Sequence, residues 1–249
     1  MITNPDRHDG FGSQYQTIIY SAIFASLNNQ EFMYEPFKQI EHNYDNDPDF
    51  NEKIEKLINF KDNFKNAPEG LQDRQKISVQ EFIKFFEDDM NQCLKSEMFL
   101  KIKGLFYLNK VNPFQENTFN IAIHIRRNND TDNKCGDTNL QQRYLPDLAF
   151  VNIIKSLLEI YSYKDNLTIH IYSQGHSKNF KVFQDIDSRI NLHLDGPVTD
   201  TFISLVYAEV LVISPSSLSY VSGLLSNGRV FAVPFWHKLG PNWTQIIIK

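Results

Sequence analysis

Two adjacent arginines directly follow a buried-type strand pattern. Arg126 and Arg127 come after the β-branched, mostly apolar run at residues 119–125, and His124 shares one side of that strand with Arg126. A guanidinium group presents a planar fork of hydrogen-bond donors that matches phosphate oxygens. Two such groups directly after a buried strand cost free energy unless they pair with an anion. The pattern predicts an anion site, and a surface pair that bridges to local aspartates is an equally good interpretation.

A serine-rich turn supplies a second feature of the same kind. Ser216 and Ser217 stand between the apolar run at 210–214 and a helical pattern. Hydroxyls and backbone N–H groups at a helix start attract anions, although ordinary capping by serine uses the same residues. Capping is the better interpretation of the turn alone. Because the carboxyl ends of parallel strands share one edge of a sheet, the turn and the arginines are expected to converge.

Two weaker features lie elsewhere in the chain. Gly10 and Gly12 precede a helical pattern at residues 13–27, where glycine permits close approach of a ligand to the backbone. A plain turn is the preferred interpretation of this pair. Asp200 opens the helical pattern at residues 200–208, where a carboxylate either caps the helix or accepts hydrogen bonds from a guanine edge.

The second half of the chain alternates between strand and helix patterns. This alternation predicts right-handed crossovers and a doubly wound parallel sheet, which binds ligands beyond the carboxyl ends of its strands. The expected strands cover residues 119–125, 167–172, 190–194, 210–214 and 229–233, and the expected helices cover 146–160, 179–183, 200–208 and 216–225.

The first half is patterned more weakly. A capping box at residues 78–81 predicts a helix that continues to about Ser96, and residues 37–70 suggest loops and short helices. A change of texture near residues 111–113 suggests two domains, residues 1–113 and 114–249.

Composition narrows the functional classes. With 41% hydrophobic residues and 20 Phe, the 249-residue chain can build a real core. The net charge of −5 argues against nucleic-acid binding through bulk charge. The two cysteines favour a reduced compartment. No membrane-spanning run or signal peptide is visible in the sequence, and this pattern favours a cytoplasmic protein. Removal of an anchor would leave the same pattern. The seven histidines show no metal-ligand spacing, so no metal is expected.

Taken together, these motifs resemble the fucosyltransferase superfamily, which contains the α-1,2-, core α-1,6- and protein O-fucosyltransferases. His-x-Arg-Arg, the donor-phosphate motif of that family, is reproduced at residues 124–127, and its strand ending in Ser-Ser is similar to residues 210–217. Asp200 stands within one residue of the family's guanine-reading acid. The Gly-x-Gly-x-Gln motif of the family looks like residues 10–14, whereas residues 31–111 carry no matching motif.

The resemblance implies a two-lobed, GT-B-like α/β fold. A Rossmann-like lobe at residues 114–249 would bind the nucleotide sugar, and a reduced, partly helical lobe at residues 1–113 would shape the acceptor site. The implied reaction is inverting, metal-independent transfer of fucose from GDP-fucose to a glycan or protein hydroxyl, without a cofactor.

The resemblance also implies roles for individual residues. Arg126 would neutralise the β-phosphate, with Arg127 and Ser217 assisting, and His124 and Asp200 would recognise guanine. The remaining donor-binding residues implied by the motifs are Gly10, Gly12, Gln14 and Ser216.

The general base is less clear. The family commonly follows its arginine pair with Gly-Asp or Thr-Asp, whereas Asn128 and Asn129 displace the acid here by one position. Asp130 is the first choice for the base, with Asp132 and Asp137 as further candidates, and Arg143 either lines the site or is exposed.

Other functions stay open at this point. A related transferase would use another GDP- or UDP-sugar, because phosphate motifs do not name the sugar. A non-catalytic nucleotide-binding module is favoured by the departure at Asn128 and Asn129 and by the short first lobe. A subunit that assists a partner transferase is the third alternative.

Overall fold

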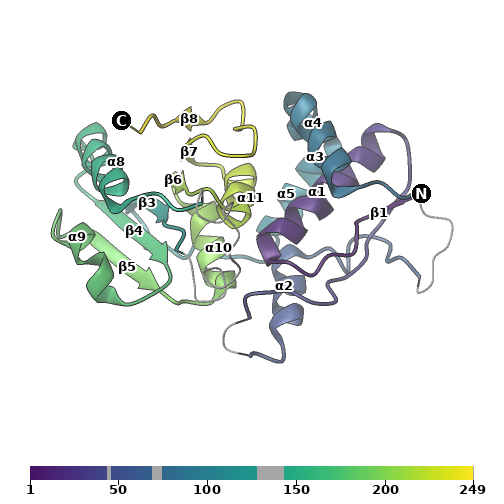
Figure 1. The fold of residues 1–249 in the computed structure, drawn as a ribbon, viewed down its shortest axis with the longest axis horizontal. Coiled ribbons are helices and arrows are strands. Elements are labelled where there is room, and N and C mark those ends of the chain that lie inside the picture. The colour runs from purple at the N-terminus through teal and green to yellow at the C-terminus, as the bar shows by residue number, and fades with distance from the viewer. Residues whose placement is uncertain (44–45, 69–74, 128–142, 249) are drawn as a thin grey trace. The chain divides into compact units, whose positions relative to one another are not determined.

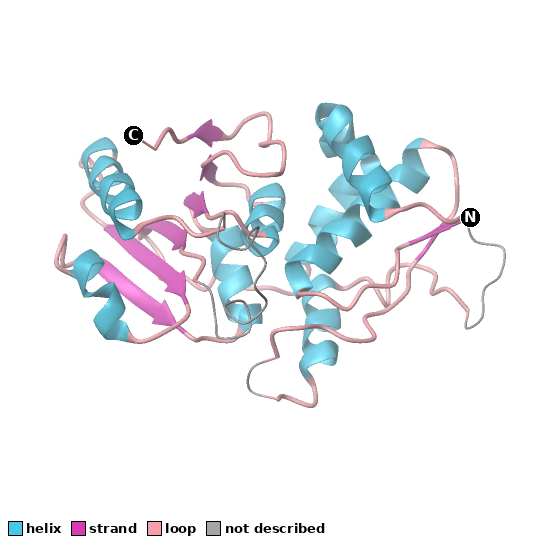
Figure 2. Ribbon diagram, viewed as in Figure 1, coloured by secondary structure: helices cyan, strands magenta, loops and turns pink. Residues whose placement is uncertain are grey.

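The computed structural model describes residues 1–43, 46–68, 75–127 and 143–248. The chain forms two compact units, residues 1–111 and residues 112–249 (Figure 1). The sequence suggested a division after residue 113. Figure 2 shows that the described part of the first unit is mainly helical, whereas the second unit contains the large sheet.

Unit 1 is built around a buried central helix. Helix α1 (Phe11–Leu27) is buried along most of its length, and Tyr20 stacks on Phe86 of the next long helix with ring centroids 3.9 Å apart. A short parallel pair of strands, β1 and β2, lies at the start of the unit. The described elements are β1 (Ile2–Thr3), β2 (Phe32–Met33), α2 (Phe50–Ile58), α3 (Val79–Asp88), α4 (Met90–Lys95) and α5 (Glu97–Tyr107).

The capping box is confirmed, but the prediction of one continuous helix behind it is wrong. Ser78 and Glu81 make both hydrogen bonds of the box. The helix is interrupted at Asp89, whose backbone has φ −130° and ψ 56° and whose carboxylate accepts a hydrogen bond from the N–H of Gln92. Because an aspartate side chain can replace the missing backbone partner, a second helix restarts at this residue.

Unit 2 contains a six-stranded sheet in which every strand is parallel to its neighbours. The spatial order is β5-β4-β3-β6-β7-β8. The strands are β3 (Phe119–His124), β4 (Leu167–Ser173), β5 (Ile190–Leu194), β6 (Val210–Ile213), β7 (Arg229–Ala232) and β8 (Thr244–Gln245). The first five agree with the sequence prediction to within one residue at each end, and β8 was not predicted.

The strand order reverses direction at β3. From β3 the chain proceeds outward through β4 to β5, and it then returns to β6 on the other side of β3. This is the order of the doubly wound, Rossmann-like sheet, whose ligand crevice opens where the order reverses. The connecting helices are α8 (Asp147–Ile160), the 3₁₀ turn η1 (Ser177–Phe180), α9 (Lys181–Gln184), α10 (Val198–Tyr207) and α11 (Ser217–Leu225).

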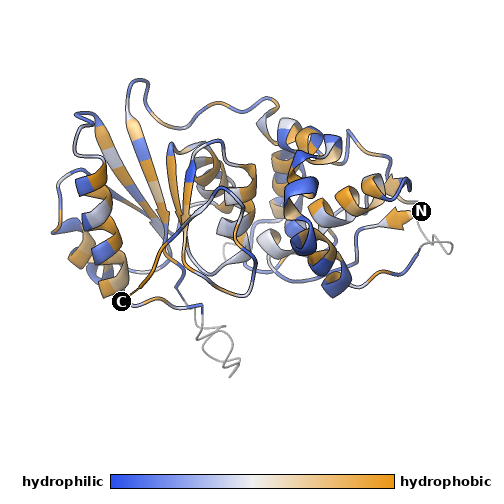
Figure 3. Ribbon diagram, turned by 90° about the horizontal axis from the view of Figure 1, so that it is seen from above, coloured by the Kyte–Doolittle hydropathy of each residue, from blue (hydrophilic) through white to orange (hydrophobic). Residues whose placement is uncertain are grey.

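Alternation along the strands separates the two faces of this sheet. Ile121, Ile123 and Ile125 join the buried cluster beneath α8 and α9, so His124 belongs to the opposite face. Figure 3 shows the hydrophobic strands of unit 2 next to helices that carry both hydrophobic and hydrophilic residues. Among the described residues, no helix is long and apolar enough to cross a membrane.

Candidate anion-binding site

The ends of β3 and β6 are joined by one serine side chain. Ser214 directly follows β6, and its Oγ donates a hydrogen bond to the carbonyl oxygen of His124. The same Oγ accepts a hydrogen bond from the backbone N–H of Arg126 at 3.0 Å. The predicted convergence of the arginine motif and the serine turn is therefore present in the backbone, at the point where the strand order reverses.

His124 is a buried, neutral histidine at this point. Burial, together with the positive charge of Arg126, lowers the pKa of its imidazole to about 3. Among the described residues, its Nδ1 has no hydrogen-bond partner. A buried ring nitrogen of this kind is a hydrogen-bonding group that a ligand can satisfy.

The start of helix α11 has no side-chain cap among the described residues. Ser216 is the residue before the first turn, with an extended backbone at φ −153° and ψ 133°. Within the described parts of the chain, its side chain makes no capping hydrogen bond, so the ordinary capping interpretation is wrong for Ser216. Ser216 and Ser217 are both partly exposed. The first N–H groups of α11, with their favourable dipole, thus begin three residues beyond Ser214.

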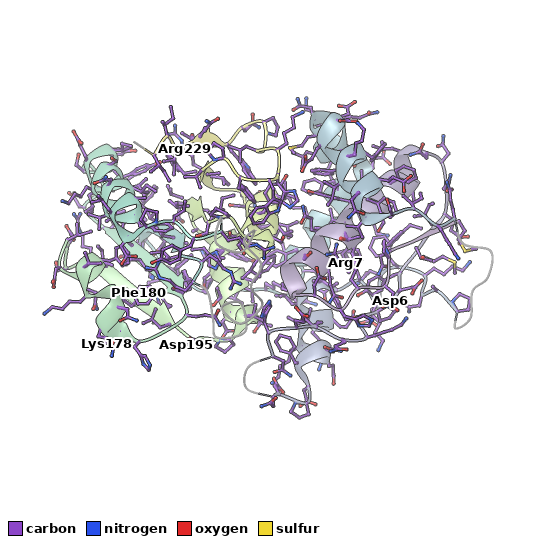
Figure 4. The ribbon with its side chains drawn as sticks, in the orientation of Figure 1. Asp6, Arg7, Lys178, Phe180, Asp195 and Arg229 are labelled. Carbon is purple, nitrogen blue, oxygen red and sulfur yellow. The ribbon has the colours of Figure 1, made fainter. Side chains whose placement is uncertain are left out.

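Arg127 has different surroundings from Arg126. Its Nη2 forms an ion pair with Asp147 Oδ1 at 2.5 Å, in the first turn of α8. Its guanidinium carbon also lies 5.2 Å from the ring centre of Tyr144 and 5.3 Å from that of Phe180, which Figure 4 labels. The alternative interpretation, an arginine that bridges to an aspartate, therefore describes Arg127. It differs in one respect, because Arg127 is mostly buried and not a surface residue.

Arg143 and Trp236 form a second cationic and aromatic pair in unit 2. The Arg143 guanidinium carbon lies 5.0 Å from the ring centre of Trp236, which follows β7 and is 45% exposed. Cations over indole rings are favourable contacts. Strands β6 and β7 are parallel, so their carboxyl ends share one edge of the sheet. Ser214 comes after β6 at this edge, and Trp236 comes after β7. Sequence reasoning missed Trp236, although the run Phe235-Trp236-His237 directly after a predicted strand was a usable signal.

Asp200 does not cap a helix. Helix α10 begins at Val198, two residues earlier than predicted, and its N-cap is Pro197. Asp200 is an exposed residue of the first turn, where its carboxylate accepts a hydrogen bond from the Thr199 hydroxyl at 3.3 Å. The carboxylate is thus accessible to a ligand.

The glycine motif is organised by contacts within unit 1. Gly10 is the N-cap of α1, and a Cβ at this position would lie 2.8 Å from Cδ2 of His42. Gln14 donates from Nε2 to the carbonyl oxygens of Asp9 and Gln39, at 2.5 and 2.8 Å. These contacts show that Gly10 and Gln14 shape the start of the helix.

The same segment is held from the side by Arg7. Its guanidinium pairs with the carboxylate of Asp9 and donates to the hydroxyl of Thr17 at 3.1 Å (Figure 4). Gly12 is buried in the first turn of α1.

Asp130, Asp132 and Asp137, the candidates for the general base, lie outside the described residues.

No protein-family model and no curated protein matches the chain. What the fold and the site define is a doubly wound parallel sheet with a candidate anion site at its switch point.

Proposed function

We propose that the protein is an inverting, metal-independent glycosyltransferase that transfers fucose from GDP-fucose to a glycan or protein hydroxyl. The observation that carries the proposal is the hydrogen bond from the backbone N–H of Arg126 to Ser214, which holds the arginine motif beside the turn that precedes α11. Arginine and helix N–H groups together match the oxygens of a pyrophosphate. The sugar and the guanine base come from the resemblance to fucosyltransferases.

In the proposed reaction, an acceptor hydroxyl oxygen attacks C1 of the sugar on the face opposite to GDP. The new C1–O bond forms while the bond from C1 to the β-phosphate oxygen breaks, and its electron pair leaves with GDP. Arg126 and the N–H groups of α11 stabilise the charge that develops on the leaving phosphate. The acceptor proton passes to a carboxylate base, for which Asp130 is the first choice.

Base recognition and acceptor binding complete the proposal. Asp200 accepts hydrogen bonds from the guanine edge, and buried His124 contributes its ring nitrogen to the same nucleotide. Unit 1 has the role of the acceptor-side lobe of a GT-B-like enzyme.

A second candidate function is a nucleotide-binding module without catalytic activity. The observation that favours it is the ion pair of Arg127 with Asp147, which neutralises one of the two cations in the motif. A transferase for another GDP- or UDP-sugar is the third candidate, because nothing in the phosphate contacts names the sugar.

The decisive experiment measures binding and turnover separately. Isothermal titration with GDP and GDP-fucose reports binding, and release of GDP in the presence of a panel of glycan and peptide acceptors reports transfer. We expect GDP binding in the wild type, with transfer to at least one acceptor. Arg126→Ala should weaken donor binding and should reduce transfer by about 10²–10³-fold, as loss of a preorganised donor does.

Arg189→Ala is the matched control for this experiment. Arg189 is another arginine of unit 2, and it pairs with Asp187 at a partly exposed position. The control should retain GDP binding and transfer. GDP binding without transfer to any acceptor supports the non-catalytic module, and equal effects of the two substitutions would refute the assigned role of Arg126.

A further inference from the structure

Two histidines meet on the sheet face opposite to α8. His170 lies in the middle of β4, and His193 lies near the end of β5. Nδ1 of His170 and Nε2 of His193 are 2.9 Å apart. The residues are 23 positions apart in sequence, and the parallel pairing of the two strands, in which Tyr172 lies opposite His193, brings them together.

An asparagine fixes the tautomer of His170. Asn120 Nδ2 donates to the Thr118 carbonyl oxygen at 3.1 Å and to Glu209 Oε2 at 3.2 Å, so its Oδ1 is the acceptor that faces His170. His170 Nε2 lies 3.2 Å from this oxygen and carries the hydrogen. Nδ1 of His170 therefore presents a lone pair to His193. Histidines that bind metals are commonly oriented by such a partner on the other ring nitrogen.

Neighbouring rings restrict both imidazoles. Tyr172 stacks on His193 with ring centroids 4.6 Å apart and an interplanar angle of 13°. Phe114 contacts His170 with ring centroids 4.9 Å apart. The site is accessible, because His193 is exposed and His170 is partly exposed.

We propose that His170 and His193 form a binding site for a divalent transition-metal ion, with His170 Nδ1 and His193 Nε2 as its two protein ligands. Two neutral imidazoles suit Zn²⁺, Ni²⁺ and Cu²⁺, and water molecules complete the coordination. The metal replaces the hydrogen between the rings, and this hydrogen moves to Nδ1 of His193. Binding therefore requires no net loss of a proton from either histidine.

This site is separate from the anion site. Its ligands come from β4 and β5, whereas the candidate anion site lies at the ends of β3 and β6. Since β5 pairs only with β4 among the described strands, a bound ion would cross-link an edge strand to the sheet. A ligand that binds only the folded state stabilises it by mass action.

The test is a titration of the full chain with Zn²⁺ alone after treatment with a chelator. We expect one Zn²⁺ bound per chain and an increase in Tm. Loss of an outer partner typically lowers metal affinity about 10–100-fold, so loss of a ligand in His193→Gln should lower it by at least about tenfold. His176→Gln, which removes an exposed histidine of the same unit, should bind Zn²⁺ like the wild type.

NMR of the histidine ring nitrogens identifies the ligating atoms. Without metal, His193 should carry its hydrogen on Nε2, and with Zn²⁺ it should carry it on Nδ1, whereas His170 should keep its hydrogen on Nε2. Since His193 is exposed on an edge strand, its variant tests the site even if His170→Gln fails to fold. Absence of Zn²⁺ binding to the wild type, or unchanged affinity in His193→Gln, would overturn the proposal.

Discussion

Ser214 Oγ lies 3.0 Å from the backbone nitrogen of Arg126 and also donates to the carbonyl oxygen of His124. One buried hydroxyl thus satisfies two backbone groups at the point where β3 ends. These contacts fix the main chain of the arginine motif relative to the turn that starts α11. The hydroxyl therefore positions the candidate site without itself having to touch a phosphate.

Ser214→Ala should destabilise unit 2 and weaken nucleotide binding. The substitution leaves the N–H of Arg126 without this partner, and an unsatisfied buried group costs about 1–3 kcal/mol. We expect GDP to bind about tenfold more weakly, which corresponds to about 1.4 kcal/mol. Urea unfolding and calorimetric titration with GDP measure the two effects.

Ser173→Ala provides the matched comparison for Ser214→Ala. Ser173 Oγ donates to the carbonyl oxygen of Ile125 at 2.7 Å, on the other flank of β3. This variant should lose stability but keep its affinity for GDP. A loss of GDP affinity as large as that in Ser214→Ala would mean that loosening of the whole sheet, rather than placement of Arg126, causes the effect.

The ion pair between Arg127 and Asp147 should contribute to the stability of unit 2. A double-mutant cycle of Arg127→Ala and Asp147→Ala should give a coupling energy of about 1 kcal/mol, because Arg127 is mostly buried whereas Asp147 is partly exposed. Denaturant unfolding of the four proteins measures it. A coupling energy of zero, together with loss of GDP binding in Arg127→Ala alone, would instead assign Arg127 to the ligand.

Asp200 should determine the preference for guanine. A hydrogen bond to a charged group contributes about 1.5–3 kcal/mol, so the wild type should bind GDP at least about tenfold more tightly than UDP. Asp200→Asn should lose this preference, whereas Asp185→Ala, at another exposed carboxylate of unit 2, should keep it. Competition between GDP and UDP in a binding assay gives the ratio, and equal affinities in the wild type would remove Asp200 from the site.

The buried His124 should make stability depend on pH. Its pKa is lowered to about 3 in the folded state, so only the unfolded chain takes up a proton as the pH falls below about 6.5. Stability from this residue is thus complete above pH 6.5 and is lost progressively between pH 6.5 and pH 3. Between pH 7 and pH 5 the loss is about 2 kcal/mol.

His124→Gln removes this contribution, whereas His176→Gln at an exposed histidine leaves it in place. Urea unfolding at pH 7 and pH 5 should therefore give a smaller pH dependence for His124→Gln than for the other two proteins. Equal dependence in all three would indicate that the pKa of His124 is not lowered in the folded protein.

The first five strands of unit 2 were predictable because they are short runs with apolar residues between helices that carry a clear apolar stripe. The strands at residues 190–194 and 229–232 could be predicted from their own residues and the turns that flank them. In the candidate site, the joining of Arg126 and Ser214 also followed from topology, since parallel strands end at one edge.

Contacts between distant side chains could not be predicted in this way. The pairing of Arg127 with Asp147 depends on the rotamer and on the stacking rings, and the meeting of His170 with His193 depends on strand register. The interruption of the helix at Asp89 was also missed, because the apolar stripe continues across it. The backbone conformation at Asp89 depends instead on its own carboxylate, which accepts a hydrogen bond from the N–H of Gln92.

The position of β3 at the centre of the sheet has a consequence for the order of folding. During synthesis, β3 and β4 emerge before β6, because the partner on the other side of β3 begins only at Val210. The long loop between β3 and β6 must close before that pairing forms, which favours slow completion of the sheet. The backbone of Arg126 and the start of α11 are therefore joined only after most of the chain has been synthesised, so the candidate anion site forms late in folding.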